Sequence, residues 1–95
     1  MTDPVAERRY LEVWSRPELS DRDRRLLLTG LLVAQGLDEE IEIQLDAALR
    51  TGDLTPGELR AAVAFLTHYA GWSRGARLSR QAEELIDRID PQARR

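Results

Sequence analysis

The 95-residue sequence contains no cysteine and no lysine, and its only histidine is His68. Without cysteine the chain can form neither disulfides nor thiolate metal sites, and it has no thiol nucleophile. Without lysine it has no Schiff-base nucleophile, and a single histidine excludes multi-histidine metal sites. We therefore expect chemistry that uses no metal and no cofactor.

Charge and hydropathy exclude further classes of partner. The 14 basic side chains, all arginine, are outnumbered by 17 acidic ones, which argues against nucleic-acid binding. The longest strongly apolar stretch, residues 26–34, is too short to cross a membrane, and the opening residues Met1–Pro4 show no basic or apolar leader. We expect a cytoplasmic protein that binds a small-molecule substrate or ligand, and no nucleic acid or membrane.

The residues that are present indicate one small all-α domain over residues 1–95. A composition of 42% apolar and 33% charged residues is typical of a globular chain, and this length supports one core. No stretch alternates apolar and polar residues as a strand would. Apolar spacing and end signals instead predict five helices, at residues 4–14, 20–35, 38–50, 55–70 and 73–90.

Helix-end signals support these boundaries. Ser20 followed by Asp23 predicts a capping box, and Gly36 predicts a left-handed end to the same helix. Asp38 is the expected N-cap of the third helix. The run Thr55–Glu58 combines an N-cap, a proline in the first turn and a capping glutamate.

The second and fourth expected helices are apolar over most of their circumference, which is typical of helices buried on several sides. A chain of this length has few other residues with which to cover them. We therefore expect part of one of these helices to be buried by another subunit. The alternative is that the first and last helices cover the pair.

Three segments resemble the carboxymuconolactone decarboxylase family, which includes the alkylhydroperoxidase-D-like peroxidases. They are LSDRDRRLLLTGLLVAQG at 19–36, AALRTGDLTPGELR at 47–60 and YAGW at 69–72. The resemblance is clearest over residues 19–89. It implies the alkylhydroperoxidase-D-like helical fold, a homo-oligomer such as a trimer or hexamer, and pockets between helices near the subunit contacts.

The sequence departs from the family at the positions that carry chemistry. The peroxidase branch has a glutamate, two cysteines and a histidine where this chain has Arg25, Leu37, Glu40 and Gln44. Cysteine-based peroxidase activity is therefore excluded, because the chain has neither thiol. The decarboxylase branch keeps the glutamate and the histidine, whose proton-transfer role arginine and glutamine cannot perform.

Arg25 and Gln44 are the expected substrate-binding residues at these positions. Arg25 can hold a carboxylate through two hydrogen bonds, or it can be a surface arginine paired with Asp21. Gln44 lies on an apolar helix face, where its amide needs a partner, which can be a ligand or a backbone group. Tyr69 and Trp72, which match the family, can hold a substrate oxygen and form an aromatic wall, or can pack at a helix corner.

His68 and Glu40 are the candidate catalytic residues. His68 is the one side chain whose ordinary pKa lies near neutrality, although a lone histidine on an apolar face is more often structural. Glu40 precedes Gln44 by one turn and is the carboxylate nearest to the expected pocket, or simply one of the acidic residues that start a helix. We expect a cofactor-free lyase, decarboxylase or isomerase acting on a small acidic substrate of aromatic catabolism or natural-product biosynthesis. The alternative is a non-catalytic oligomeric protein that binds a ligand or has a structural role.

Overall fold

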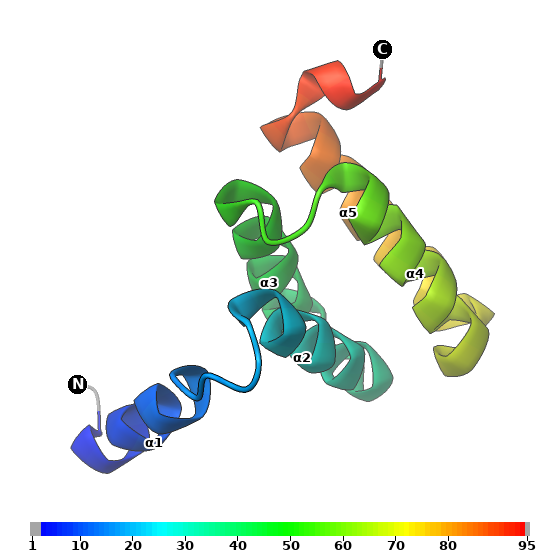
Figure 1. Ribbon diagram of the computed structural model, residues 1–95. Helices are drawn as coiled ribbons and strands as arrows, with labels where there is room; N and C mark the ends of the chain where they lie inside the picture. Colours follow the sequence, from blue (N-terminus) through cyan, green and yellow to red (C-terminus); the bar gives the residue numbers. More distant parts are fainter. Residues whose placement is uncertain (1–2, 95) are drawn as a thin grey trace.

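The computed structural model describes residues 3–94, which form an all-α fold with no strand among them. The helices are α1 (Pro4–Trp14), α2 (Asp21–Gln35), α3 (Asp38–Thr51), α4 (Pro56–Ala70) and α5 (Trp72–Ile89), followed by the short 3-10 helix η1 (Pro91–Arg94). All five expected helices are confirmed, with boundaries within about two residues of the predicted ones. The structure is therefore consistent with the helical fold that the resemblance implied (Figure 1).

The caps of α2 and α4 are those that the sequence predicts. Ser20 and Asp23 form a complete capping box, as do Thr55 and Glu58, and Gly36 ends α2 at a φ of 70°. The expected cap of α3 was wrong by one residue. Leu37 is the N-cap and makes no side-chain cap hydrogen bond, because the helix already includes Asp38.

Helices α2 to α5 enclose one hydrophobic core. Its fully buried side chains come from α3, the loop after it, α4 and α5, and the largest are Leu45, Leu54, Leu59, Leu78, Leu85 and Ile86. In Figure 1, α4 and α5 run side by side in opposite directions, and α2 lies against α3. Burying a leucine contributes about 1.5–3 kcal/mol, so this cluster supplies most of the driving force for folding.

Helices α4 and α5 come into close contact at Gly75. A Cβ atom placed on Gly75 would lie 2.3 Å from Oγ1 and 2.6 Å from Cβ of Thr67. Thr67 is itself held by a hydrogen bond of 2.7 Å from its hydroxyl to the carbonyl of Val63. Glycine is therefore needed at this crossing for lack of space.

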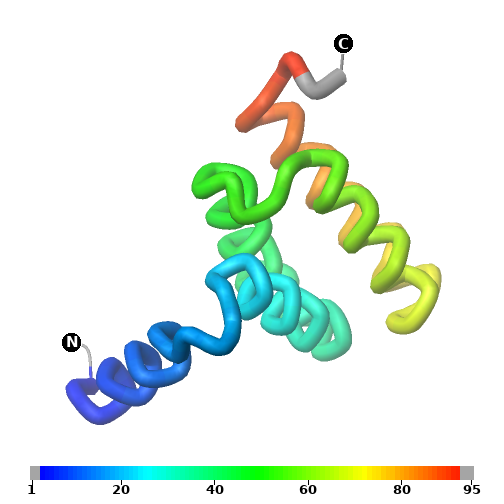
Figure 2. Tube along the Cα trace, in the orientation of Figure 1, coloured from blue at the N-terminus to red at the C-terminus, as the bar shows by residue number. Residues whose placement is uncertain are grey.

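Helix α1 extends away from the other helices, as Figures 1 and 2 show. None of its residues is buried, and Tyr10, Leu11 and Val13 are each more than half exposed. The alternative in which the first helix covers the second and fourth is therefore wrong for α1, whereas α5 does pack along α4. Among residues 3–94, no helix has the length and apolar character needed to cross a membrane.

Candidate functional site

Arg25 and Gln44 meet at the contact between α2 and α3. The Arg25 Nη1 group donates a hydrogen bond of 2.8 Å to the Gln44 side-chain oxygen. The two residues are nineteen positions apart and come together because α2 and α3 pack side by side. The side chain of Arg25 is only 14% exposed, so it lies in the body of the protein rather than in solvent. The expected alternative, a surface pairing with Asp21, is not what the structure contains, because Asp21 pairs with Arg24 instead.

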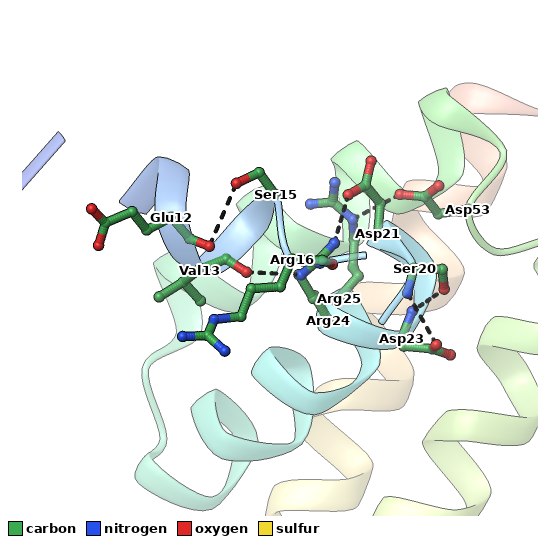
Figure 3. A network of polar contacts seen from close by, with 10 residues as sticks. All are labelled: Glu12, Val13, Ser15, Arg16, Ser20, Asp21, Asp23, Arg24, Arg25 and Asp53. Atoms are coloured by element: carbon green, nitrogen blue, oxygen red, sulfur yellow. Dashed lines mark hydrogen bonds and ion pairs between the residues drawn. The ribbon is translucent and has the colours of Figure 1, made fainter. Parts of the chain in front are cut away.

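Two further residues, which the sequence reasoning missed, hold the Arg25 guanidinium. Asp53, in the loop between α3 and α4, accepts a hydrogen bond of 3.2 Å from Arg25 Nε (Figure 3). Trp14, at the end of α1, places its ring 5.6 Å from the guanidinium carbon, within the range of a cation–π contact. Both partners come from segments distant in the sequence, and neither spacing nor composition signals them.

The cluster formed by Trp14, Arg25, Gln44 and Asp53, called here the Arg25 cluster, keeps donors for a ligand. Within residues 3–94, neither Arg25 Nη2 nor the Gln44 amide nitrogen donates a hydrogen bond to the protein. A guanidinium has five N–H donors and an amide has two. The cluster can therefore hold an anionic oxygen while Asp53 keeps Arg25 in place.

Glu40 lies near this cluster. It stands one helical turn before Gln44 on α3, so the two side chains share a face, with Cβ atoms about 5–6 Å apart. Glu40 is exposed to solvent.

His68 and Tyr69 lie near the C-terminal end of α4, and Trp72 begins α5. The His68 and Tyr69 rings are 5.0 Å apart, and both side chains are exposed. Trp72 is 85% exposed at the start of α5. The structure thus groups the predicted residues into two sets, with Arg25, Gln44 and Glu40 in one and these three aromatic side chains in the other.

The pairing of α2 with α4 shows why the two sets are separate. Arg22 contacts Glu58 and a Cβ atom on Gly30 would touch Leu66, so the two helices run in the same direction (Figure 1). Arg25 is then level with Ala61, about two helical turns before His68. Within one chain, His68 does not reach the Arg25 cluster.

An apolar groove adjoins the cluster at Trp14. It has a volume of about 480 Å³ and lies between the end of α1 and the outer face of α2, where Val13, Leu27, Leu28 and Leu31 line it. Trp14 contributes to both the groove and the cluster. A ligand with one acidic end and one apolar end fits such a junction.

The described part of the chain was searched for side chains that could together bind a metal ion. No group of three or more His, Asp or Glu side chains that could hold a metal ion occurs among residues 3–94. Two carboxyl groups with clearly shifted pKa values, Asp23 and Glu58, serve as helix caps. The Ser20 backbone amide lowers the pKa of Asp23, and the Thr55 backbone amide lowers that of Glu58.

Comparison with known proteins identifies the family. The model of the carboxymuconolactone decarboxylase family matches residues 3–84. The chain is 34% identical over 75 residues to the 4-carboxymuconolactone decarboxylase of Acinetobacter baylyi (strain ATCC 33305 / BD413 / ADP1), an alignment that covers 79% of this chain and 55% of that protein. The chain thus spans about half the length of this curated relative, and no solved structure matches it. The chain belongs to the carboxymuconolactone decarboxylase family.

Proposed function

We propose that this chain is a cofactor-free lyase that decarboxylates a small acidic substrate. The observation that carries the proposal is the contact between Arg25 and Gln44, which leaves donors of both side chains available to a ligand. The relative from Acinetobacter baylyi is a 4-carboxymuconolactone decarboxylase, and this name suggests the class of substrate. Because the sequence has no cysteine, we also propose that the chain reduces no hydroperoxide.

Decarboxylation breaks a carbon–carbon bond and leaves an electron pair on the substrate carbon. Without a cofactor, that pair must move into a conjugated carbonyl group, whose oxygen then gains negative charge. In this proposal Arg25 binds a substrate carboxylate outside the breaking bond, and the Gln44 amide donates to the carbonyl oxygen. The Arg25 hydrogen bond to the Gln44 side-chain oxygen already orients that amide, and an oriented donor of this kind stabilises such charge without reorganising, typically by about 3–4 kcal/mol.

The substrate carbon finally takes up a proton. Glu40, one turn from Gln44, is the nearer candidate to deliver it from the solvent side. His68 is the second candidate, and in this arrangement it reaches the substrate only if another subunit brings it there. Tyr69 and Trp72 remain predicted substrate contacts on the same condition.

Turnover of 4-carboxymuconolactone, measured as the release of carbon dioxide, tests the proposal. We expect Arg25→Gln to lower kcat/KM by about 100-fold, the effect of losing one charged anchor that holds the substrate. Arg22→Gln is the matched control, because Arg22 lies on the same helix and is exposed, and it should change kcat/KM by less than about twofold. Equal turnover of wild type and Arg25→Gln would refute the assignment.

The proton donor is identified in the same assay. If Glu40 delivers the proton, Glu40→Gln lowers kcat much more than His68→Gln does, and it removes the alkaline limb of the pH–rate profile, because a proton donor acts only while it is protonated. The reverse ranking would transfer the role to His68. Equal and full activity in both variants would show that solvent supplies the proton.

A non-catalytic ligand-binding protein is the second candidate function. It is favoured by the pairing of Arg25 with Asp53 and by the exposure of His68 and Glu40. Such a protein would bind the acid through Arg25 but would release no carbon dioxide. Binding without turnover across a panel of lactone acids would select this function.

A further inference from the structure

An apolar groove opens to the solvent between the end of α1 and the outer face of α2. Its volume of about 480 Å³ is within the range of small-molecule sites. The half-buried Leu28 lines it together with Leu27 and Leu31, which are 65% and 54% exposed. Exposed apolar surface of this kind marks a place where a ligand or a partner binds.

This groove meets the Arg25 cluster at Trp14 and Leu28. Trp14 lines the groove and also places its ring 5.6 Å from the Arg25 guanidinium carbon. Leu28 follows Arg25 by three positions on α2, so the two side chains are neighbours on the helix surface, with Cβ atoms about 5–6 Å apart. A ligand bound to the Arg25 guanidinium can therefore extend from there into the groove.

The cluster and the groove differ in polarity. In the cluster, Arg25 Nη2 and the Gln44 amide nitrogen donate no hydrogen bond to the protein within residues 3–94, so they can bind an anionic oxygen. The groove is lined mainly by apolar side chains, and its two exposed charged residues, Arg16 and Glu18, have opposite signs. The occupant that matches both parts has a carboxylate at one end and an apolar remainder.

Arg24 fixes the wall that α1 contributes to the groove. Its side chain is buried and donates a hydrogen bond of 3.1 Å to the Val13 carbonyl, a second to the Arg16 carbonyl and a third to Asp21 (Figure 3). A guanidinium on the last carbonyls of a helix satisfies groups that the helix leaves unpaired. Val13 and Trp14 are thereby held beside α2, and the groove is formed before a ligand binds.

The length of the groove sets the size of the apolar part. Leu31 lines the groove and follows Arg25 by six positions, so its Cα atom lies about 9 Å further along the axis of α2. Carbon–carbon bonds of about 1.5 Å that meet at about 111° advance an extended chain by about 1.25 Å per bond, so about seven bonds span this distance.

We propose that the substrate is an amphipathic carboxylic acid, whose carboxylate binds Arg25 and whose apolar chain or ring system lies in the groove. Its apolar part is equivalent in length to about seven carbons. This inference rests on the proposed function, because it extends the acid assigned to Arg25. It adds Leu31 as a residue that selects the length of the substrate, whereas 4-carboxymuconolactone occupies only the polar end of the site.

Calorimetric titration of the full-length chain with unbranched alkanoates, from butanoate through hexanoate and octanoate to decanoate, is the first test. We expect Kd to fall by about two- to fourfold for each added CH2 group, fourfold being the limit of complete burial. The fall should stop beyond octanoate, where the chain extends past Leu31. Octylammonium, which has the same tail and the opposite charge, should bind at least about 10-fold more weakly than octanoate. A constant Kd along the series, or equal Kd values for octanoate and octylammonium, would overturn the proposal.

Leu31→Ser and Ile43→Ser are the matched variants for the groove. Both residues are exposed, at 54% and 64%, but Ile43 lies on α3 and does not line the groove. We expect Leu31→Ser to raise Kd for octanoate by about fivefold or more and to leave Kd for butanoate unchanged, whereas Ile43→Ser changes neither. Arg25→Gln should raise Kd by about 10-fold at every chain length. Equal effects of the two serine variants would overturn the proposal, as would a groove covered by a second copy of the chain, which gives a constant Kd along the series. Circular dichroism checks that every variant is folded.

Release of carbon dioxide from 4-carboxymuconolactone is measured separately and concerns the proposed decarboxylation alone. If no carbon dioxide is released while Kd falls along the alkanoate series, the site binds amphipathic acids without lyase activity, and the assignment of the groove stands. If carbon dioxide is released while Kd is constant along the series, the decarboxylation stands and the assignment of the groove is refuted.

Discussion

Replacing Gly75 with alanine tests the close contact between α4 and α5. The added Cβ would lie 2.3, 2.4 and 2.6 Å from three side-chain atoms of Thr67, and rotation of Thr67 about its χ1 bond does not move the last of these, its own Cβ. The clash is therefore relieved only if α4 and α5 move apart. Leu78 and Leu85, which are buried on the same helix, would lose contacts in that movement.

Two opposing effects set the magnitude of this change. Overpacking a tight contact costs about 1–3 kcal/mol, whereas replacing glycine by alanine inside a helix contributes about 1 kcal/mol of stability. Because three atoms clash rather than one, we take the upper part of the first range. The net loss in the free energy of unfolding is then about 1–2 kcal/mol, which lowers Tm by roughly 4–16 °C in a domain of this size.

Gly57→Ala and Gly30→Ala are the controls for this prediction. A Cβ on Gly57 has its nearest neighbour at 3.9 Å, and one on Gly30 has it at 3.5 Å, which are ordinary contacts. Both substitutions should leave the stability unchanged or raise it by up to about 1 kcal/mol through helix propensity. Thermal unfolding followed by circular dichroism measures all three. If Gly75→Ala is as stable as the controls, the close α4–α5 contact is refuted.

Three further predictions concern the contact of Arg24 with the end of α1, the helix caps and the absence of cysteine. Arg24→Met removes the hydrogen bonds that the buried Arg24 side chain donates to the Val13 and Arg16 carbonyls and should lower the free energy of unfolding by about 1–2 kcal/mol in a urea titration; an unchanged midpoint would show that these contacts do not stabilise the fold. The cap hydrogen bonds lower the pKa values of Asp23 and Glu58 below their ordinary 3.8 and 4.5. A lowered pKa in the folded state means that this stabilisation is complete above those ordinary values and is lost as the pH falls through the folded values. Tm should therefore decrease as the pH is lowered below about 4.5, and Glu58→Gln should make that decrease smaller. An identical dependence of Tm on pH in wild type and variant would contradict this prediction. Finally, incubation of the chain with an alkyl hydroperoxide and a dithiol should consume no more peroxide than the dithiol alone, and catalysed consumption would contradict the thiol argument.

The sequence predicts the helices well because their end signals are local. Ser20 with Asp23 and Thr55 with Glu58 are three residues apart, and each pair forms its cap without help from the rest of the fold. The cap of α3 was missed by one residue because its N-cap is Leu37, whose side chain makes no cap hydrogen bond and so gives no local signal in the sequence.

The site was predicted in part, for reasons that are again physical. The resemblance selected Arg25 and Gln44, and the packing of α2 on α3 brings them into contact. Asp53 and Trp14 could not be found in this way, because a loop carboxylate and a helix-end ring meet Arg25 only through tertiary structure. The alternative pairing of Asp21 with Arg25 was wrong because Arg24 makes that contact, and helix spacing alone does not say which of two adjacent arginines turns towards Asp21.

The central claim is that Arg25 binds the acidic group of the substrate, and a calorimetric titration tests it most directly. The decarboxylated lactone acid, which keeps the carboxylate assigned to Arg25 and is not turned over, is titrated into wild type, Arg25→Gln and the control Arg22→Gln. We predict that Arg25→Gln raises Kd by about 10-fold or more, the loss of one charged hydrogen-bonded anchor, while the control keeps the Kd of the wild type. Equal Kd values for wild type and Arg25→Gln would contradict the account.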